Sequence, residues 1–291
     1  MSNISQVIEE RAADIGNFMV GRLLPFRQKR AVGPFVFIDH MGPADMSEHE
    51  NLDVPPHPHI GLSTLTFLFE GEMVHRDSIG SKVTIKPGAV NWMTAGKGVV
   101  HSERTPQKLR GTKKSLHGLQ IWVALPEELE ESEPTFTHVS ASEIPEKNVD
   151  GVKMKLIAGE ALGMKSPVPV HSSLYFAELK TNEETQVDIG DQLYGESALY
   201  ILEGSVKSEG EEFGSKQILI AKDAELCSFT MSKNTTVYLF GGKPFPEERY
   251  INWNFVSSSK ERLKQAKTDW IEKRFPEIPG ESGFVPYPGS V

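Results

Sequence analysis

The sequence has a single cysteine, Cys227, among its 291 residues. One cysteine cannot form an intramolecular disulfide, and it cannot build a zinc site held by several thiolates. Disulfide-stapled folds and thiolate zinc modules are therefore excluded. We expect Cys227 to pack as a small hydrophobic side chain.

Long apolar runs are also missing. A membrane-spanning helix needs about 20 consecutive apolar residues, and no stretch approaches that length. The first ten residues lack the basic and then apolar order of a secretory signal. Hydrophobic residues make up 38% of the chain and charged residues 24%, which is typical of soluble globular proteins. We therefore predict a cytoplasmic protein that does not bind a membrane.

The chain also lacks an excess of basic residues, since its net charge is −9. Proteins that bind a nucleic-acid backbone need a concentrated basic surface, so we predict no direct nucleic-acid binding. Two short basic runs, residues 27–30 and 108–114, could still contact an anionic partner. Solvated loops are the simpler interpretation of both runs.

Closely spaced metal-ligand residue types are what the chain does contain. His57-Pro58-His59 and His101-Ser102-Glu103 each place two candidate ligands one residue apart. On a strand, residues i and i+2 share a face, so both pairs can point into one interior. Imidazoles with a carboxylate suit Fe, Mn, Ni, Co, Cu or Zn. The spacing predicts a small antiparallel barrel around one divalent ion, held by His57, His59, His101 and Glu103.

Other polar residues near this stretch have two interpretations each. His75 would share a strand face with Met73 and Asp77, either supporting a ligand or substrate or serving as a structural, hydrogen-bonded histidine. Asp39 and His40 could hydrogen-bond a ligating imidazole, as metal-bound histidines usually require, or could form a turn.

A second half begins near residue 136. The run Tyr200–Val206 echoes Phe67–Met73 at an offset of 133 residues, which indicates a duplicated barrel. No His-x-His pair occurs in this half. We therefore predict a metal-binding barrel over residues 1–135, and over residues 136–291 a second barrel without metal ligands, followed by a helix and an arm.

The tail carries the helix signals. Ser258 and Glu261 have the spacing of a capping box, and Leu263, Ala266 and Trp270 recur at helical spacing. This apolar stripe should dock on a barrel, with a partner protein as the alternative. Residues 276–291 should form an extended arm, and the acidic run 126–134 a solvated loop.

Several motifs together resemble the pirin family of the cupin superfamily, and the likeness covers nearly the whole chain. They are Val32–Pro43, Pro56–Leu62, Phe69–Ser78, Val90–Gly96 and His101–Glu103. The resemblance implies an all-β bicupin, that is, two antiparallel β-barrels of jelly-roll type with the helix packed on a barrel. It also implies one metal ion in the N-terminal barrel, usually Fe(II), on the four residues named above.

One departure from general cupins supports this assignment. Those proteins place a glutamate four to five residues beyond the His-x-His pair, whereas Ser63 and Thr64 stand there in this chain. A fourth ligand at Glu103 is the pirin arrangement. The C-terminal half resembles the family more loosely.

The resemblance further implies chemistry. Four protein ligands on an octahedral ion leave two open positions, which a flavonol-type substrate and O2 could fill. Similarity to flavonol-cleaving pirins implies oxidative ring opening of a quercetin-like substrate with release of CO. In that reaction Glu103 is the catalytic residue, as a ligand or as a proton acceptor by temporary detachment.

Two other functions remain open. The resemblance also includes metal-binding regulators, transcription co-regulators or modulators of metabolic enzymes, that act through protein–protein contacts. Arg22, Arg27, Lys29 and Arg30 would then face the partner. The remaining alternative is a structural metal, which would be four-coordinate and closed.

Overall fold

The computed structural model describes residues 4–15, 18–221 and 228–289, so Cys227 lies outside the described residues. Strands dominate, and α1 (Lys260–Ile271) is the single α-helix in this part of the chain. No helix in the described ranges is both long and apolar enough to cross a membrane. The all-β bicupin class predicted from the sequence is confirmed.

The chain forms two compact units, each made of three segments, and the segments of the two units alternate along the sequence. We call them the C-barrel unit, with segments Met1–Ala12, Gly21–Ile38 and Ser142–Phe245, and the N-barrel unit, with segments Ala13–Val20, Asp39–Ala141 and Pro246–Val291. The division predicted above, between residues 135 and 136, gives two domains that are each continuous in sequence. It remains a prediction.

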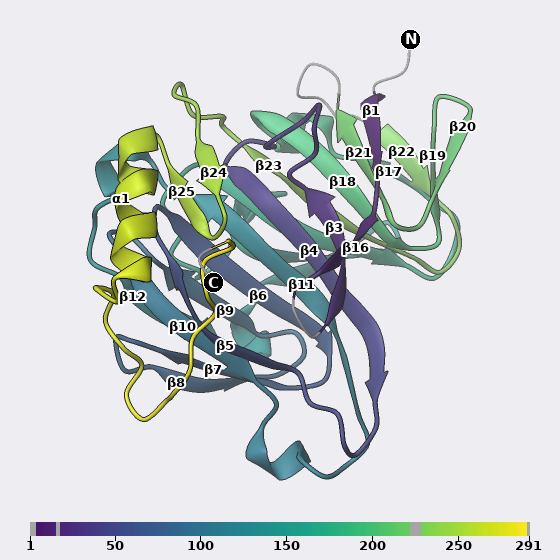
Figure 1. Cartoon of the computed structure of the whole chain (residues 1–291). Coiled ribbons are helices and arrows are strands. Elements are labelled where there is room, and N and C mark those ends of the chain that lie inside the picture. Colours follow the sequence, from purple (N-terminus) through teal and green to yellow (C-terminus); the bar gives the residue numbers. More distant parts are fainter. Residues whose placement is uncertain (1–3, 16–17, 222–227, 290–291) are drawn as a thin grey trace. The chain divides into compact units, whose positions relative to one another are not determined.

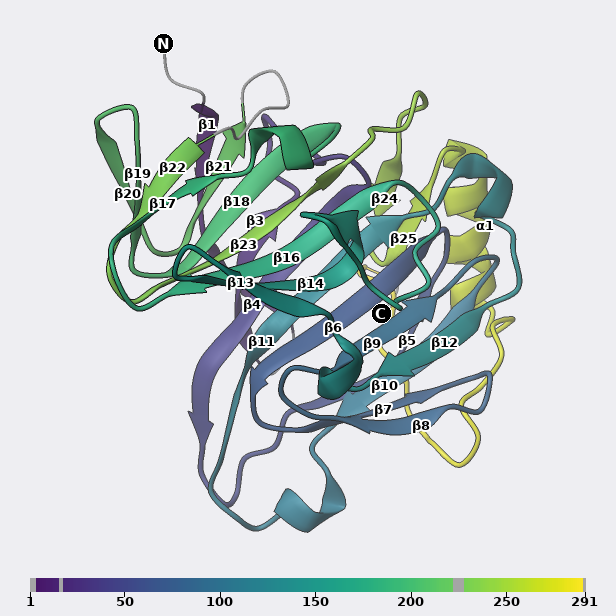
Figure 2. The same cartoon turned by 180° about the vertical axis from the view of Figure 1, so that it is seen from behind.

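The C-barrel unit contains two antiparallel sheets, and Figure 2 labels all of their strands except β15. The larger sheet has the order β1-β21-β18-β23-β16-β14-β13, with β15 beside β14, and the smaller has the order β17-β22-β19-β20. The elements are β1 (Ile4–Glu9), β13 (Glu146–Val149), β14 (Val152–Ala161), β15 (Met164–Lys165), β16 (Leu174–Thr181), β17 (Thr185–Asp188), η4 (Gly190–Gln192), β18 (Glu196–Glu203), β19 (Ser205–Ser208), β20 (Glu211–Gly214), β21 (Gln217–Ala221), β22 (Ser228–Met231) and β23 (Thr235–Gly242).

The N-barrel unit contains two larger antiparallel sheets and the two-stranded sheet β24-β25. One larger sheet has the order β5-β10-β7-β8, and the other contains the neighbours β12-β9-β6-β11. Its elements are β5 (Asp53–His59), β6 (Leu62–Glu70), β7 (Met73–Asp77), β8 (Lys82–Ile85), β9 (Val90–Thr94), β10 (Val99–Arg104), η1 (Gln107–Leu109), β11 (Lys114–Ala124), η2 (Glu127–Leu129), β12 (Thr135–Val139), β24 (Tyr250–Asn252) and β25 (Phe255–Ser257). The chain passes between the units within β2 (Arg11–Asp14), β3 (Met19–Leu24), β4 (Phe35–Met46) and η3 (Ala141–Glu143).

The internal repeat predicted from the sequence is visible in matching strands. Strand β6 ends at Glu70 and β18 ends at Glu203, which is the offset of 133 residues. A short antiparallel strand, β7 or β19, follows in each unit. The absence of a metal from the second barrel remains a prediction.

Strand β7 shows why the polar residues of the N-barrel unit point inward. Met73, His75 and Asp77 are 2%, 3% and 1% exposed, whereas the intervening Val74 and Arg76 are only partly buried. Alternation along the strand therefore turns His75 and Asp77 toward the interior, as the sequence predicted. A buried histidine and a buried carboxylate both require hydrogen-bond partners.

Helix α1 packs within the N-barrel unit, beside β24 and β25 (Figure 1). Leu263, Ala266 and Trp270 are its buried residues, and they join a cluster with Val100 of β10 and Phe255 of β25. The predicted docking of the helix on a barrel is confirmed.

The predicted capping box is wrong by one residue. The N-cap is Ser259, whose hydroxyl accepts a hydrogen bond from the amide of Arg262 at 3.3 Å. Ser258 instead donates to Glu130, from its amide at 2.8 Å and from its hydroxyl at 3.1 Å. The prediction that the acidic loop 126–134 is solvated is therefore wrong at Glu130, which is 5% exposed and also pairs with Arg249 at 3.1 Å.

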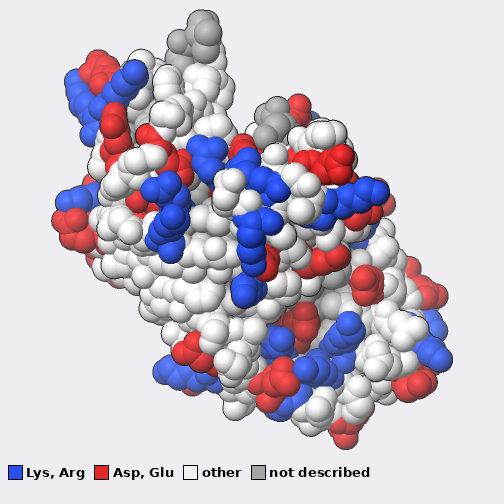
Figure 3. Space-filling view, turned by 90° about the horizontal axis from the view of Figure 1, so that it is seen from below, with Lys and Arg blue, Asp and Glu red and all other residues white. Residues whose placement is uncertain are grey.

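Two cations of the second basic run form ion pairs. In the run 108–114, Lys108 pairs with Glu72 at 2.7 Å and Arg110 pairs with Asp53 at 2.6 Å. Figure 3 shows one face of the molecule, on which Lys and Arg lie among Asp and Glu.

Candidate metal centre

Two paired strands bring three of the predicted ligands together. In the antiparallel register of β5 and β10, His101 lies opposite His57, and His59 follows on the same face of β5. One ring nitrogen from each of His57, His59 and His101 lies within 4.8 Å of the other two. The three side chains are 7%, 1% and 1% exposed.

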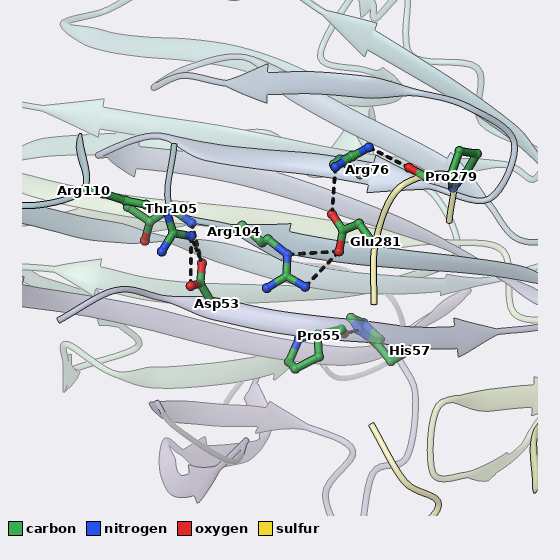
Figure 4. Close-up of polar contacts among 9 residues, drawn as sticks. All are labelled: Asp53, Pro55, His57, Arg76, Arg104, Thr105, Arg110, Pro279 and Glu281. Carbon is green, nitrogen blue, oxygen red and sulfur yellow. Dashed lines mark hydrogen bonds and ion pairs between the residues drawn. The ribbon is translucent and has the colours of Figure 1, made fainter. Parts of the chain in front are cut away.

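Hydrogen bonds on the outer ring nitrogens fix the orientation of two of these imidazoles. Nδ1 of His57 donates to the carbonyl of Pro55 at 2.9 Å, as Figure 4 shows. Nδ1 of His59 donates to the carbonyl of Asn254 at 3.0 Å. Since a carbonyl only accepts, both neutral rings carry their proton on Nδ1 and keep a lone pair on Nε2.

A histidine from the neighbouring strand performs the same task for His101. Nε2 of His75 donates to Oδ2 of Asp77 at 2.9 Å, so Nδ1 is the ring nitrogen that His75 turns toward His101. Nδ1 of His101 lies 3.4 Å from that atom. The buried Asp77 is itself fixed by the amides of Ile79 and Ser81, at 3.1 and 2.8 Å. All three candidate ligands thus present Nε2 to a common point.

The carbonyl of Asn254 reaches His59 because the tail of the chain is pinned to the end of β5. Phe255 forms a parallel bridge with Ile60, and the amide of Val256 donates to the carbonyl of Ile60 at 3.2 Å. Gly61 permits this approach, because a Cβ at that position would lie 1.9 Å from the carbonyl oxygen of Val256. The ring of Trp122 also contacts His59 in a T-shaped arrangement, with ring centroids 5.1 Å apart.

Burial keeps the imidazoles neutral. Desolvation lowers the pKa of His57 to about 4, and it lowers the pKa of His59 and of His101 well below the ordinary value. Burial has the opposite effect on a carboxyl group and raises the pKa of Glu103 to about 7. Neutral imidazole is the form that binds a metal ion.

The donor set fits a cation. Nε2 of His59 and Nε2 of His101 are 3.1 Å apart, and in the neutral tautomers described above two lone pairs face each other. Two imidazoles at right angles on one ion, with bonds of about 2.1 Å, place their nitrogens about 3.0 Å apart. A divalent ion would therefore relieve the repulsion between the lone pairs without moving the rings.

Glu103 is placed differently from the histidines. It is 7% exposed and lies two residues beyond His101 on β10, opposite His75 of β7. A register shift separates His101 from Glu103 on the β5 side of the strand. Among the described residues, the cluster of candidate ligand atoms consists of the three histidines and does not include the carboxylate of Glu103. A fourth ligand at Glu103 therefore remains a prediction.

Other polar residues lie near these imidazoles. The ring partners of the three candidate ligands are Pro55, Asn254 and His75. The hydrogen bond suggested for Asp39 remains a prediction. His40 instead faces His117, with 2.8 Å between their Nε2 atoms.

Sequence reasoning missed three contributors: Asn254, Trp122 and Phe136, whose ring stacks on His75 at 4.4 Å between centroids. Asn254 acts through its main-chain carbonyl, 195 positions from His59, so its residue type gives no signal. Trp122 and Phe136 carry no pattern that separates them from core aromatics.

Comparisons with known proteins agree with this architecture. The chain matches the family model described as Pirin over residues 17–123 and the model described as Pirin C-terminal cupin domain over residues 175–276. It is 48% identical over 290 residues to a pirin-like protein of Caulobacter vibrioides, covering 98% of this chain and 99% of that protein.

Solved structures give the same result. The crystal structure of a quercetin 2,3-dioxygenase from Acinetobacter baumannii matches with a TM-score of 0.89 and 36% identity, covering 97% of this chain and 94% of that one. The bacterial pirin YhhW of Escherichia coli, solved in complex with nickel(II), matches with a TM-score of 0.65 over 82% of this chain and 99% of that one. At 19% identity, the second likeness supports the fold alone. The chain belongs to the pirin family.

Proposed function

We propose that this pirin-family protein is a metal-dependent dioxygenase that opens flavonol-type substrates with O2 and releases CO. The observation that carries the proposal is the convergence of three buried Nε2 atoms, two of them 3.1 Å apart, with the Nδ1 atoms of His57 and His59 bound to carbonyls. Likeness to a structure named quercetin 2,3-dioxygenase, at 36% identity, supports this substrate class.

In this proposal, His57, His59 and His101 hold the ion through Nε2, and Glu103 is the fourth ligand. Fe(II) is the ion we propose, with Mn, Ni, Co, Cu and Zn as the alternatives that this donor set accepts. The chemistry that a bound ion supplies is Lewis acidity toward the flavonol 3-hydroxyl and a meeting point for that group and O2.

The protein's own contribution is to hold ligands and to move one proton. The Nδ1 contacts fix the rings, so that binding needs little reorganisation. Without a bound ion, burial raises the pKa of Glu103 to about 7. A cation beside it would lower that pKa, so Glu103 would be ionised as a ligand and able to accept the 3-hydroxyl proton when it detaches.

The experiment starts with metal content. We would determine bound metals by mass spectrometry, load the protein with Fe(II) without oxygen, and follow the quercetin absorbance and CO after admitting air. We expect metal-dependent loss of the flavonol band with matching CO. His101→Ala should abolish both, whereas His138→Ala, at an exposed histidine bound to Asn91, should leave both unchanged. Binding of metal and flavonol without turnover would refute the proposal.

The regulator alternative is not favoured by a specific observation. Of the four residues suggested to face a partner, Lys29 pairs with Glu196 at 2.6 Å and the guanidinium of Arg22 lies 4.6 Å from the ring centroid of Phe37. These two cations are already engaged within the C-barrel unit.

A further inference from the structure

A cavity of about 310 Å³ lies in the N-barrel unit, between strands β5 and β10 and the segment from Phe275 to Tyr287, which we call the C-terminal arm. Val100 lines the cavity and directly precedes His101 in β10. Because successive side chains on a strand point to opposite faces, the cavity lies on the other side of this sheet from the three clustered histidines. It is therefore separate from the metal centre.

Specific contacts hold the arm over the sheet. Nε1 of Trp270 donates to the carbonyl of Val285 at 2.9 Å, and the amide of Val285 donates to the carbonyl of Pro56 at 2.8 Å. Arg104 donates twice to one carboxylate oxygen of Glu281, at 3.0 and 2.8 Å, in the cluster drawn in Figure 4. The cavity walls are thus formed before any ligand arrives, which lowers the entropic cost of binding.

Three of the twelve residues that line the cavity are aromatic. Trp270, Phe275 and Phe284 line the cavity, with ring centroids 5.8 Å apart for Trp270 and Phe275 and 6.0 Å apart for Trp270 and Phe284. Pockets for small molecules have volumes of about 300–1,000 Å³ and are lined mainly by apolar and aromatic groups. Phe284 is 50% exposed and so marks an opening to solvent. Such a lining favours a flat aromatic ligand.

One uncompensated cation lies at this cavity. The ammonium of Lys273 is 5.3 Å from the ring centroid of Phe284, and no carboxylate pairs with it among the described residues. Of the two acidic residues in the lining, Glu281 pairs with Arg104 and Arg76, and Glu277, exposed like Lys273, forms no ion pair with it. Lys273 is therefore available to pair with one negative charge on a ligand.

The backbone of Lys273 ends helix α1. The amide of Lys273 bonds to the carbonyl of Trp270 at 3.1 Å, and the amide of Arg274 bonds to the carbonyl of Asp269 at 2.7 Å. This is the Schellman end of a helix, whose left-handed position usually holds glycine. Lys273 occupies it with φ of 57°. Glycine would therefore relieve the left-handed conformation at this position.

We propose that this cavity is a second small-molecule site, which binds a flat aromatic carboxylate or sulfonate with its rings among Trp270, Phe275 and Phe284 and its anion on Lys273. The site does not involve the metal centre, so the proposal stands or falls independently of the dioxygenase function.

The test uses two fluorescent probes that share one ring system. 1-Anilinonaphthalene-8-sulfonate carries an anion, and N-phenyl-1-naphthylamine is its neutral counterpart. We would titrate each into the full-length protein and follow probe emission together with energy transfer from tryptophan. We expect saturable binding of one sulfonate per chain, with an affinity about tenfold higher than that of the neutral probe, since one charge-assisted contact is lost.

Matched lysine variants locate the site. Lys273→Met should weaken the sulfonate probe about tenfold and leave the neutral probe unchanged. Lys260→Met removes the same charge from a lysine that also lies over a ring, 4.5 Å from the centroid of Tyr250, but outside the cavity. It should change neither affinity.

Lys273→Gly separates binding from folding. Glycine relieves the left-handed conformation, so the variant should melt at a higher temperature than the parent while binding the sulfonate probe about tenfold more weakly. Three results would each overturn the proposal: sulfonate binding that does not saturate, binding unchanged in both Lys273 variants, or equal weakening by Lys260→Met.

Discussion

Nδ1 of His101 lies 3.4 Å from Nδ1 of His75. The two histidines lie on neighbouring strands. His101 of β10 is opposite Asp77 of β7, and Asp77 follows His75 by two residues on that strand. Asp77, His75 and His101 therefore form a line of buried groups that ends at the candidate metal position. This line of contacts determines which nitrogen of His101 faces the ion. The two ligand motifs in the sequence do not predict that orientation.

Replacing His75 tests this line. His75→Phe keeps the stacking on Phe136 but removes the ring nitrogen that faces His101, so we expect metal affinity to fall about 10- to 100-fold, as for other residues that orient metal-bound histidines. Competition with a chromophoric chelator measures the change. His138→Phe, at an exposed histidine, is the control and should leave affinity unaltered. Equal affinity in the His75 variant and the parent would show that the line does not orient His101.

Metal loading should stabilise the protein. An ion that binds only the folded state adds about 2.7 kcal/mol to the free energy of unfolding at a concentration 100-fold above its dissociation constant. Thermal unfolding of metal-free and loaded protein should show this increase, and a chelator should reverse it. His59→Ala should remove the shift, whereas His49→Ala, whose side chain is 88% exposed, should retain it. A shift that persists in His59→Ala would place the ion elsewhere.

The grouping of His57, His59 and His101 could be predicted because the alternation of side chains along a strand is a local property. Spacing of one residue fixes a common face once a strand is assumed, and the register of β5 with β10 completes the group. Glu103 shows the limit of this reasoning, since a register shift after His101 alters the geometry on the β5 side. A bulge depends on the partner strand and leaves no mark at Glu103 itself.

Non-local contacts account for the remaining errors. The motif around Ser258 satisfies the capping pattern, yet its hydroxyl and amide bind Glu130, which is 128 positions away. The same contact turns a charged residue of an acidic run into a buried one. Hydrophobic periodicity predicts which face of an element is apolar. It does not predict which distant carboxylate will hydrogen-bond to the residues at the N-terminus of a helix.

Glu130 offers a direct test of this buried contact. Glu130→Ala leaves Arg249 buried without its carboxylate and removes the acceptor for Ser257 and Ser258, so we expect a loss of about 3–5 kcal/mol in the free energy of unfolding. Urea unfolding measures the loss. Glu128→Ala, at an exposed position of the same loop, should change stability by less than about 0.5 kcal/mol. A similar small effect at Glu130 would show that its contacts do not stabilise the fold.

The C-terminal arm should loosen in acid through Glu281. Burial alone raises the pKa of this carboxyl, but hydrogen bonds and charge from Arg104 and charge from Arg76 outweigh it, and the pKa lies below the ordinary value of 4.5. Because the folded-state pKa is the lower one, the stabilisation is complete above about pH 4.5 and is lost as the pH falls through the folded-state value. Tryptophan emission should report the change, since Trp270 donates to Val285 of the arm.

Variants assign that transition to one carboxylate. Glu281→Gln cannot form the ion pairs, so its emission at pH 7 should already resemble that of the parent in acid, with no further step as the pH falls. Glu277→Gln, at an exposed residue of the same arm, should keep the step at the parental pH. All of these readings can be taken on metal-free protein. A step that survives in Glu281→Gln would assign the transition to an acid-sensitive group other than Glu281.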